Sequence, residues 1–329
     1  MRIFARVVLA ALSALILSLS PIFVSPSSAV APTTAGDILV ADPGSGTIRH
    51  YSASGAFIDE FASGLNSPSW ITADRIGNIY VSEHDGQRIS VFSPTGANLL
   101  TITTPYKPGG VQVSPDGTIY VADYFGGKIY RYSASGTADP VPFASTPLVQ
   151  ADFMAFDAGG NLYVTGVTVT DSLLEPVVHR VSPTGADLGD FVTGFSGPEG
   201  IAFDAEGNLY VASFNSDIIQ KYSALGADLG PFASLGLSAS MFGIAFDASG
   251  NLYVANFAEH SIHKFSPAGV EQLPVFILTG QDAQDAPRDL VIVPLGAAPT
   301  VKEECKEDGW QSFDFKNQGD CIQLVNTGK

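Results

Sequence analysis

The string Gly77-Asn78-Ile79-Tyr80-Val81 decides the fold, because close copies of it recur along most of the chain. The copies stand at 117–121 (GTIYV), 160–164 (GNLYV), 207–211 (GNLYV) and 250–254 (GNLYV), with a looser one at 36–40 (GDILV). Successive copies are 41, 40, 43, 47 and 43 residues apart. Ile, Val and Tyr favour strands, and a nearly fixed period of this length is typical of repeat proteins.

Each copy lies in a longer unit of four predicted strands. A run such as 200–204 (GIAFD) precedes the copy, and a third strand, a turn and a fourth strand follow it. The turn is rich in Ser, Pro and Gly, as at 93–96 (SPTG) and 266–269 (SPAG), because Pro presets φ and Gly accepts positive φ. The apolar runs show no sustained 3.6-residue period, which argues against helices. Six units of about 44 residues with four strands each predict an all-β, six-bladed β-propeller.

The two ends of the repeat region indicate how the ring closes. The first unit starts with its second strand at 37–42, whereas the last repeat-like segment, 286–293 (APRDLVIV), resembles a first strand with no second strand after it. The first blade is therefore split between the termini. We expect the C-terminal strand to pair with the N-terminal strands, which removes two open sheet edges.

The string Gly-Asn-Leu-Tyr-Val-Ala, followed by a polar turn and Ile-x-x-Tyr/Phe-Ser, resembles the NHL-repeat six-bladed propellers over about residues 36–294. More distantly, the chain is similar to the senescence-marker/gluconolactonase propellers and to virginiamycin B lyase. The resemblance implies the propeller fold. It leaves the function open, because propellers include binding proteins, lactonases and lyases.

The first 31 residues have the pattern of a cleaved secretory signal. Arg2 and Arg6 precede an uncharged apolar run at 7–19, and Ala29-Val30-Ala31 fits a cleavage site. The alternative is an uncleaved anchor, but the run is shorter than the roughly 20 residues that span a bilayer. We therefore expect a secreted or periplasmic protein without membrane insertion. Its predicted segments are a signal peptide at 1–31, the propeller at 32–296, a linker at 297–304 and a tail at 305–329.

The charge balance excludes one class of partner. The chain has 16 Lys and Arg against 33 Asp and Glu, a net charge of −17, and removal of 1–31 takes this to −19. Nucleic acid is therefore not an expected partner, because binding it needs a basic surface. With 45% hydrophobic and 15% charged residues, the chain is expected to fold around a core, and we expect a monomer.

The C-terminal tail differs in kind from the repeats. It contains both cysteines of the chain, Cys305 and Cys321, which we expect to pair in an exported protein and to contribute about 3 kcal/mol. The string from Cys305 through Trp310 to Cys321 resembles a tail found on secreted bacterial proteins. Docking through Trp310 and Phe313 is one hypothesis for its role.

In a propeller, first strands begin and second strands end at the same end of the central channel, which we call the mouth. The residues just before the first strands are Ser69, Gly109, Asp152, Glu199, Phe242 and Arg288. The last residues of the second strands are Asp42, Glu83, Asp123, Gly166, Ser213 and Asn256. Carboxylates hold five of these twelve positions, and such oxygen ligands suit Ca²⁺ or another divalent cation.

Two interpretations of these carboxylates remain open. The resemblance to gluconolactonases implies a metal site at the mouth, with Asp152 and Glu199 nearest to that family's ligand positions, although Glu199 replaces a ligand-type Asn. The five metal candidates are Asp42, Glu83, Asp123, Asp152 and Glu199. The alternative for Asp42, Glu83 and Asp123 is that they cap their own turns.

Histidines offer a second candidate site. Virginiamycin B lyase uses His and Glu for catalysis, so the resemblance implies Glu259, His260 and His263 as candidates for acid–base work. The alternative is that His263 is an ordinary strand residue, since it alternates with apolar neighbours.

One blade carries an expanded turn at 165–176. Such an excursion is either a binding element or an insertion that packs Leu173 and Leu174 on the next blade. Our leading hypothesis is an exported, non-enzymatic propeller that presents one face to a protein or glycan ligand. The alternative is a divalent-metal-dependent hydrolase or lyase at the acidic mouth, of the lactonase or virginiamycin B lyase kind.

Overall fold

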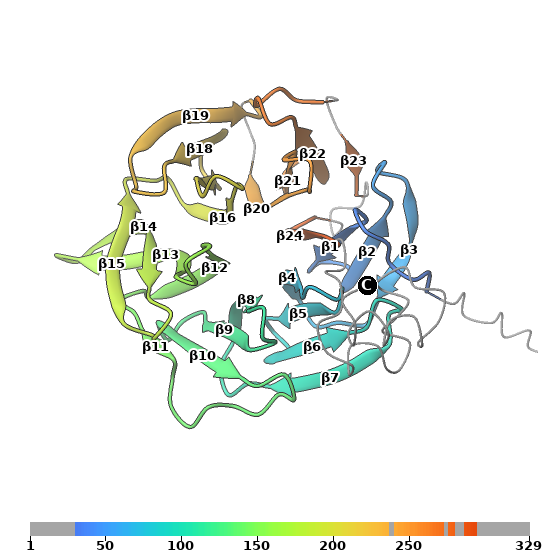
Figure 1. The fold of residues 1–329 in the computed structure, drawn as a ribbon, viewed down its shortest axis with the longest axis horizontal. Coiled ribbons are helices and arrows are strands. Elements are labelled where there is room, and N and C mark those ends of the chain that lie inside the picture. Colours follow the sequence, from blue (N-terminus) through green and yellow to red (C-terminus); the bar gives the residue numbers. More distant parts are fainter. Residues whose placement is uncertain (1–29, 237–239, 273–275, 280–285, 295–329) are drawn as a thin grey trace, which may run out of the picture.

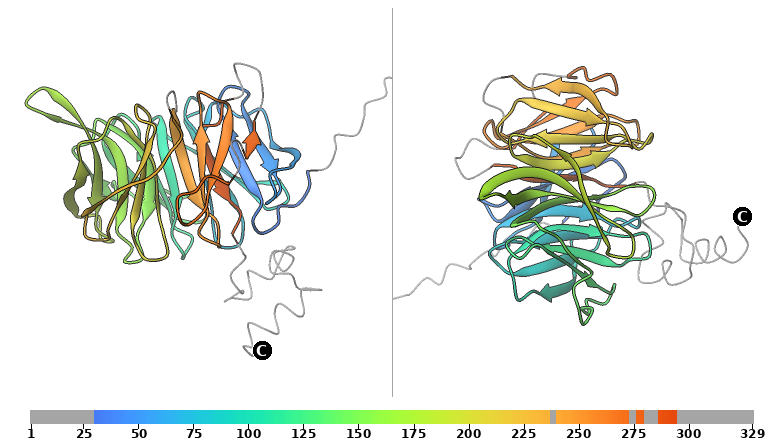
Figure 2. Two further views of the ribbon diagram at one scale, coloured as in Figure 1. Left: turned by 90° about the horizontal axis from the view of Figure 1, so that it is seen from above. Right: turned by 90° about the vertical axis from the view of Figure 1, so that its left-hand side faces the viewer.

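The computed structural model describes residues 30–236, 240–272, 276–279 and 286–294. All regular structure in these residues is β, in six four-stranded antiparallel sheets. Figure 1 shows the sheets as blades around a central axis, and Figure 2 shows that together they form a thick disc. The predicted six-bladed propeller is confirmed.

Strands of the same rank occupy the same place in every blade. The first strands line the channel: β24 (Asp289–Ile292), β4 (Pro68–Ala73), β8 (Pro108–Val113), β12 (Gln150–Phe156), β16 (Pro198–Phe203) and β20 (Met241–Phe246). The second strands are β1 (Ile38–Asp42), β5 (Ile79–Glu83), β9 (Ile119–Asp123), β13 (Leu162–Thr170), β17 (Leu209–Ser213) and β21 (Leu252–Asn256). The third strands are β2 (Thr47–Tyr51), β6 (Arg88–Phe92), β10 (Lys128–Tyr132), β14 (Leu173–Val181), β18 (Ile218–Tyr222) and β22 (Ser261–Phe265). The outer strands are β3 (Phe57–Ala62), β7 (Asn98–Thr103), β11 (Ala144–Ser145), β15 (Asp187–Thr193), β19 (Asp228–Ser234) and β23 (Ile277–Leu278).

The first blade closes the ring as predicted. Its strand order is β24-β1-β2-β3, and β24 pairs with β1 from Ala41↔Asp289 to Ile38↔Ile292. The backbone bond from Val293 N to Asp37 O, 2.8 Å long, extends this pairing by one residue. The two ends of the repeat region therefore share one sheet, which leaves no open edge at the join.

The core lies between neighbouring blades, because both faces of each inner sheet are covered. All five residues of β5, β17 and β21 are buried, whereas the outer strands β3 and β7 are mostly exposed or half-buried. This explains why the second strands are nearly continuous apolar runs instead of alternating apolar and polar residues.

The second, fourth, fifth and sixth blades turn from their first to their second strand through a compact Asp turn at the end opposite the mouth. In the second blade, Asp74 accepts hydrogen bonds from the amides of Ile76 and Asn78 and from the Tyr80 hydroxyl, at 3.0, 2.9 and 3.2 Å. Gly77 completes the turn with φ +84°, a conformation that glycine adopts without strain. The Asn and Tyr of the repeated string are therefore fixed by the turn that precedes it.

The residue paired with the repeat tyrosine varies between blades. In the fifth and sixth blades it is Lys221 or Lys264, whose ammonium lies 4.8 Å from the centre of the tyrosine ring and pairs with the turn carboxylate. In the second blade it is Val91. Burial there raises the pKa of Asp74, which has no lysine opposite it.

The expanded turn of the fourth blade is a β-hairpin. Strands β13 and β14 pair from Leu162↔Val181 out to Thr170↔Leu173, and the hairpin projects from the disc in Figure 2. Leu173 and Leu174 are 65% and 70% exposed. The interpretation that they pack on the next blade is wrong, because the inserted residues pair with each other and extend beyond the body of the blade.

No helix in the described part of the chain is long and apolar enough to cross a membrane.

Candidate functional site

The six residues predicted to precede the first strands do lie one per blade, but most of them are not outside the strand as expected. In five blades they belong to the first strand itself, at a β-bulge: the register shifts, for example, between Pro68 and Trp70 and between Pro198 and Ile201. A bulge places two residues opposite one and redirects a side chain. It thus explains how the strand continues past these residues while their side chains turn toward the channel.

Three of these residues meet across the mouth. Asp152 from β12, Glu199 from β16 and Arg288, which precedes β24, come from three different blades. The Arg288 Nη2 atom lies 3.3 Å from Asp152 Oδ2 and 3.9 Å from Glu199 Oε2. The carboxylate pair implied by the sequence is therefore joined by the one arginine of the mouth positions.

The second blade also contributes to this group, through a hydrogen bond to Asp152. The indole Nε1–H of Trp70 donates to Asp152 Oδ1 at 2.7 Å, from a tryptophan that is 3% exposed. A hydrogen bond to a carboxylate is among the stronger kinds in proteins. Trp70 and Arg288 together hold the Asp152 carboxylate in place.

The neighbouring Glu199 carboxyl has an altered affinity for its proton. Burial and the adjacent Asp152 carboxylate raise the pKa of Glu199 well above its usual value, and Arg288 offsets only part of this effect. Its Oε2 atom is inaccessible to solvent and has no hydrogen-bond partner among the described residues. Glu199 therefore holds a proton more tightly than an ordinary glutamic acid does, beside a second carboxyl group. This pair is suited to proton transfer.

Arg288 is held on both faces. Its guanidinium carbon lies 4.8 Å from the centre of the Trp70 ring and 4.6 Å from that of Phe242. Such cation–π contacts stabilise a buried cation. Burial alone would lower the pKa of Arg288, but the carboxylates of Asp152 and Glu199 outweigh it and raise that pKa.

Asp289 directly follows Arg288 in the chain and belongs to the closure of the ring, as the first residue of β24. Its carboxyl accepts hydrogen bonds from the Ile71 amide at 3.0 Å and from the Leu290 amide at 2.8 Å. Burial raises the pKa of Asp289 to about 8, although both amides and Arg288 lower it. In the third, fifth and sixth blades a glycine stands at this position, as at Gly200, where a Cβ would lie 2.1 Å from the Phe242 carbonyl oxygen. Asp289 therefore fills a gap between the first and second blades that the neighbouring backbone fills elsewhere.

Aromatic side chains surround Asp152, Glu199 and Arg288, which we call the charged cluster. The sequence analysis did not predict them. The residue directly after the second strand is His84, Tyr124, Phe214 or Phe257 in four of the six blades. Phe125, beside Tyr124, is 61% exposed, and Phe257 is 40% exposed. The position following each second strand would have revealed this ring, because its residues are aromatic or imidazole at a constant offset in the repeat.

Ring contacts join these aromatic residues to the cluster. His84 lies 5.6 Å from Trp70 and 5.0 Å from Tyr124, between ring centres, and Phe257 lies 5.4 Å from Phe242. Burial lowers the pKa of His84, and burial together with Asp152 raises the pKa of Tyr124 to about 12. Both side chains are therefore neutral near pH 7.

The other three metal candidates are engaged by their own turns. Asp42 accepts from the amides of Gly44 and Ser45 at 3.0 and 3.2 Å, and Asp123 accepts from the Gly126 amide at 3.0 Å. These contacts agree with the interpretation of the side chains as turn caps.

Glu83 is likewise bound within its own blade. It accepts two hydrogen bonds from Arg88, at 2.8 and 2.6 Å, together with bonds from the Ser90 hydroxyl and the Asn66 amide. These bonds outweigh the effect of burial and lower the pKa of Glu83. In the described ranges, no three His, Cys, Asp or Glu side chains are grouped so as to hold a metal ion. A metal site on the predicted residues stays a prediction.

The candidate acid–base residues of the sixth blade form a separate group. His263 is 3% exposed, with Nδ1 at 2.7 Å from Glu271 Oε1 and Nε2 at 3.3 Å from Glu259 Oε2. His260 lies in the turn between β21 and β22 with φ +52°. The contacts of His263 are with residues of its own blade, so the geometry favours a structural role, and catalysis there stays a prediction.

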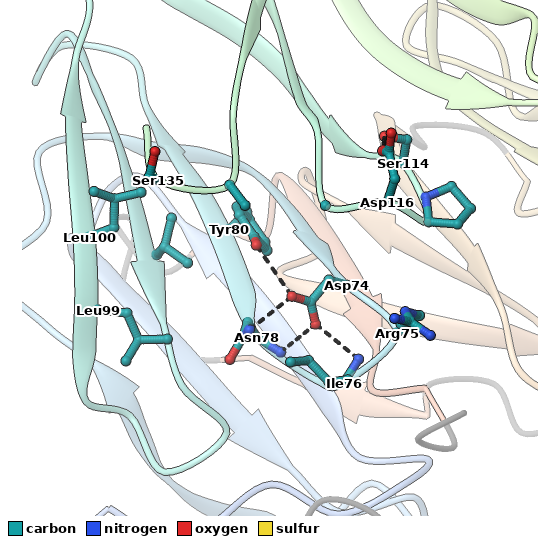
Figure 3. A pocket seen from close by; sticks show the side chains of 14 residues that line it. Asp74, Arg75, Ile76, Asn78, Tyr80, Leu99, Leu100, Ser114, Asp116 and Ser135 are labelled. Atoms are coloured by element: carbon teal, nitrogen blue, oxygen red, sulfur yellow. Dashed lines mark hydrogen bonds between the residues drawn. The ribbon is translucent and has the colours of Figure 1, made fainter. Parts of the chain in front are cut away.

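Two cavities lie at the end opposite the mouth, each between two blades. One of about 540 Å³ lies between the second and third blades and is lined by Asp74, Tyr80, Leu99, Leu100 and Asp116, as Figure 3 shows. Another of about 590 Å³ lies between the sixth and first blades, beside the equivalent turn residues Asp247 and Tyr253. The Asp carboxylates beside both cavities accept hydrogen bonds within their own turns. They therefore serve the repeated turn, and we do not regard these cavities as the functional site.

Cys305, Cys321 and residues 1–29 of the predicted signal peptide at 1–31 lie outside the described residues, so the disulfide and the signal peptide stay predictions.

Comparisons with known proteins agree with the architecture. A family model described as "Strictosidine synthase-like, N-terminal" matches residues 192–220, which include Glu199. No curated protein sequence matches the chain. Because the family model covers so few residues, it does not place the chain in that family.

Solved structures extend the likeness to most of the propeller. A chain of the nidogen–laminin complex has a TM-score of 0.66 at 17% identity and covers 78% of this chain and 98% of that one. Virginiamycin B lyase from Staphylococcus aureus has a TM-score of 0.59 at 15% identity, covering 79% and 86%. A structure assigned to a gluconolactonase has a TM-score of 0.55 at 18% identity, covering 64% and 78%.

Such identities establish a shared fold and nothing finer. The class of protein is therefore a six-bladed β-propeller, related in architecture to binding proteins, lactonases and lyases alike.

Proposed function

We propose that the protein is an exported, non-enzymatic propeller that binds a segment of a protein ligand at its mouth. The observation that carries this proposal is the set of aromatic side chains around Asp152, Glu199 and Arg288. Two of these aromatic residues, Phe125 and Phe257, are 61% and 40% exposed. Aromatic residues and arginine are the side chains most often responsible for protein–protein affinity. The projecting β13–β14 hairpin adds Leu173 and Leu174 as exposed apolar contacts.

Export and the kind of ligand have independent support. The basic, apolar and small-residue pattern of residues 1–31 supports export. The net charge of −17 argues against nucleic acid. A propeller chain of similar fold was solved in the nidogen–laminin complex, which supports a protein ligand over a glycan. The protein is proposed to act as a monomer.

Site-specific photocrosslinking in the producing cells tests the binding proposal. A photoreactive residue is placed at Phe125 or Phe257, and the matched control places it at Leu225, which is 93% exposed in a turn at the opposite end. We expect a discrete protein adduct from Phe125 and from Phe257 but not from Leu225. The adduct from position 125 should be lost when Phe257 is changed to Ser, and the adduct from position 257 when Phe125 is changed to Ser.

The outcomes separate the alternatives. Adducts that disappear after glycosidase treatment indicate a glycan ligand. Equal labelling from Leu225, or none from either phenylalanine, contradicts the proposal. Light scattering of the purified protein tests the monomer.

A second candidate function is favoured by one observation, the buried Glu199 with its raised pKa, grouped with Asp152 around Arg288. A carboxylic acid with a raised pKa is a suitable proton donor for a hydrolase or lyase. The test is turnover of lactones and of a virginiamycin-type cyclic ester by the wild type and by Glu199→Gln, with Glu206→Gln as an exposed control. Activity that falls at least 100-fold in Glu199→Gln alone would establish this candidate in place of the first.

The metal-dependent form of this alternative requires a divalent cation at the mouth. A calcium ion needs six to eight oxygen ligands at about 2.3–2.6 Å. The cluster offers the carboxylates of Asp152 and Glu199, and the guanidinium of Arg288 contacts both. These residues do not fit a calcium ion, so no step through a metal follows.

A further inference from the structure

The mouth contains its own cation, and this cation reaches across the channel. Arg288 stands at the start of the closing strand in the first blade, whereas Asp152 lies 136 residues earlier in the fourth blade. The first and fourth blades are on opposite sides of the ring in Figure 1. The side chain therefore spans the channel at the level where first strands from all six blades converge.

The guanidinium occupies the position that a bound metal ion would need. It contacts Asp152 through Nη2 at 3.3 Å and Glu199 Oε2 at 3.9 Å, and the two aromatic rings cover its faces at 4.8 and 4.6 Å. A divalent ion within about 2.6 Å of both carboxylates would overlap this group. It would also meet a like charge in a site with little access to water, which is costly.

The carboxylates have capacity for another partner if the guanidinium is removed. Glu199 Oε2 makes no hydrogen bond to any described residue and is inaccessible to solvent. Asp152 would keep the indole of Trp70 as a donor but would lose its cationic partner. Two carboxylates left together without a cation repel each other, and a divalent ion would relieve that repulsion.

We propose that Arg288 is the permanent cation of the mouth, in the place where a propeller of this architecture could hold a divalent metal ion. The wild-type protein accordingly takes no Ca²⁺ between Asp152 and Glu199, and loss of the Arg288 side chain creates a cation site there. This proposal does not depend on which ligand the mouth binds. It concerns what neutralises the two acids.

The test compares Ca²⁺ binding by the wild type, Arg288→Ala and Arg288→Lys, using calorimetry and thermal melting. We expect no saturable binding at the mouth in the wild type or in Arg288→Lys, which keeps a positive charge. Arg288→Ala should bind one Ca²⁺ with a Kd of about 0.1–1 mM, the range of weak extracellular calcium sites. The gain should disappear in Arg288→Ala/Glu199→Gln.

Terbium luminescence locates the ion. Tb³⁺ takes oxygen ligands as Ca²⁺ does and emits when a nearby indole transfers energy to it, so Trp70 serves as the internal antenna. We expect sensitised emission in Arg288→Ala that is displaced by Ca²⁺ and lost in Arg288→Ala/Trp70→Phe. This control separates the mouth from acids elsewhere on the surface.

Each outcome decides the proposal. Stoichiometric Ca²⁺ binding by the wild type that Glu199→Gln abolishes would overturn it, as would a folded Arg288→Ala protein that gains no Ca²⁺ site. If Arg288→Ala does not fold alone, refolding is repeated with Ca²⁺. Recovery of the native melting transition supports the proposal, and failure to recover overturns it.

Discussion

The buried carboxyl of Asp289 should make the stability of this propeller fall as the pH rises. Burial raises the pKa of Asp289 to about 8 from an ordinary value of 3.8. Between these two values the folded protein keeps a proton that the unfolded chain has released. The folded state therefore binds more protons, and its stability decreases with increasing pH, by about 1.4 kcal/mol per pH unit from this group.

The substitution Asp289→Asn removes this titration while keeping the shape of the side chain. The Asn carbonyl can accept from one of the two amides of Ile71 and Leu290, but its NH₂ group faces the other. A buried amide without an acceptor costs about 1–3 kcal/mol. At pH 5 the variant should thus be less stable than the wild type by about this amount.

The difference should then vanish with pH. From pH 5 to pH 7 the wild type loses roughly 3 kcal/mol through Asp289, and the variant does not. The two proteins should be about equally stable near pH 7, and the variant should be the more stable at pH 8. Urea unfolding at half-unit steps from pH 5 to pH 8 measures this, with the exposed Glu206→Gln as control for a lost surface charge. Parallel profiles, with a constant difference between wild type and variant, would show that Asp289 is ionised in the fold and refute the reasoning.

Three further predictions concern the closing strand, the repeat and the processing of the chain. Leu290→Ala, in the closing strand where Leu290 is 3% exposed, should lower the free energy of unfolding by about 2–5 kcal/mol, whereas Leu225→Ala should change it by less than about 0.5 kcal/mol; equal urea midpoints would mean that the closure carries little stability. Val91→Lys should supply the cation that the second blade lacks and lower the pKa of Asp74 in an NMR titration, although the loss of the buried Val91 side chain should reduce stability; an unchanged Asp74 pKa would contradict the comparison between blades. The exported protein should begin at Pro32 in N-terminal sequencing, and a product that retains residues 1–31 would rule out cleavage at the predicted site.

The repeat made most of the fold predictable, since one string at a constant period defines strand rank, blade number and closure together. The same period correctly assigned Asp152, Glu199 and Arg288 to one end of the channel. It did not reveal that Trp70 reaches Asp152 from another blade. A repeat assigns a residue to an end of the ring, but the reach of its side chain depends on bulges that leave the spacing unchanged.

Short side chains mark another limit of the sequence. Asp42 and Asp123 end second strands at the mouth, as the pattern predicts, yet both carboxylates fold back onto turn amides within three residues. A short Asp side chain reaches the backbone amides of its own turn but not the far side of the channel. A position at the mouth therefore did not imply contact with the charged cluster of Asp152, Glu199 and Arg288.

The split first blade has a consequence for the order of folding. Its closing contact joins Ile38 to Ile292, a separation of about 250 residues, whereas the remaining strands pair with neighbours in sequence. Contacts of such long range form slowly, because their loop entropy must be overcome first. Residue 292 leaves the ribosome last among the residues of the blades, so the ring stays an open arc until this strand has been made. Under the proposed export, that delay would extend the time during which the chain remains unfolded enough to pass through a membrane.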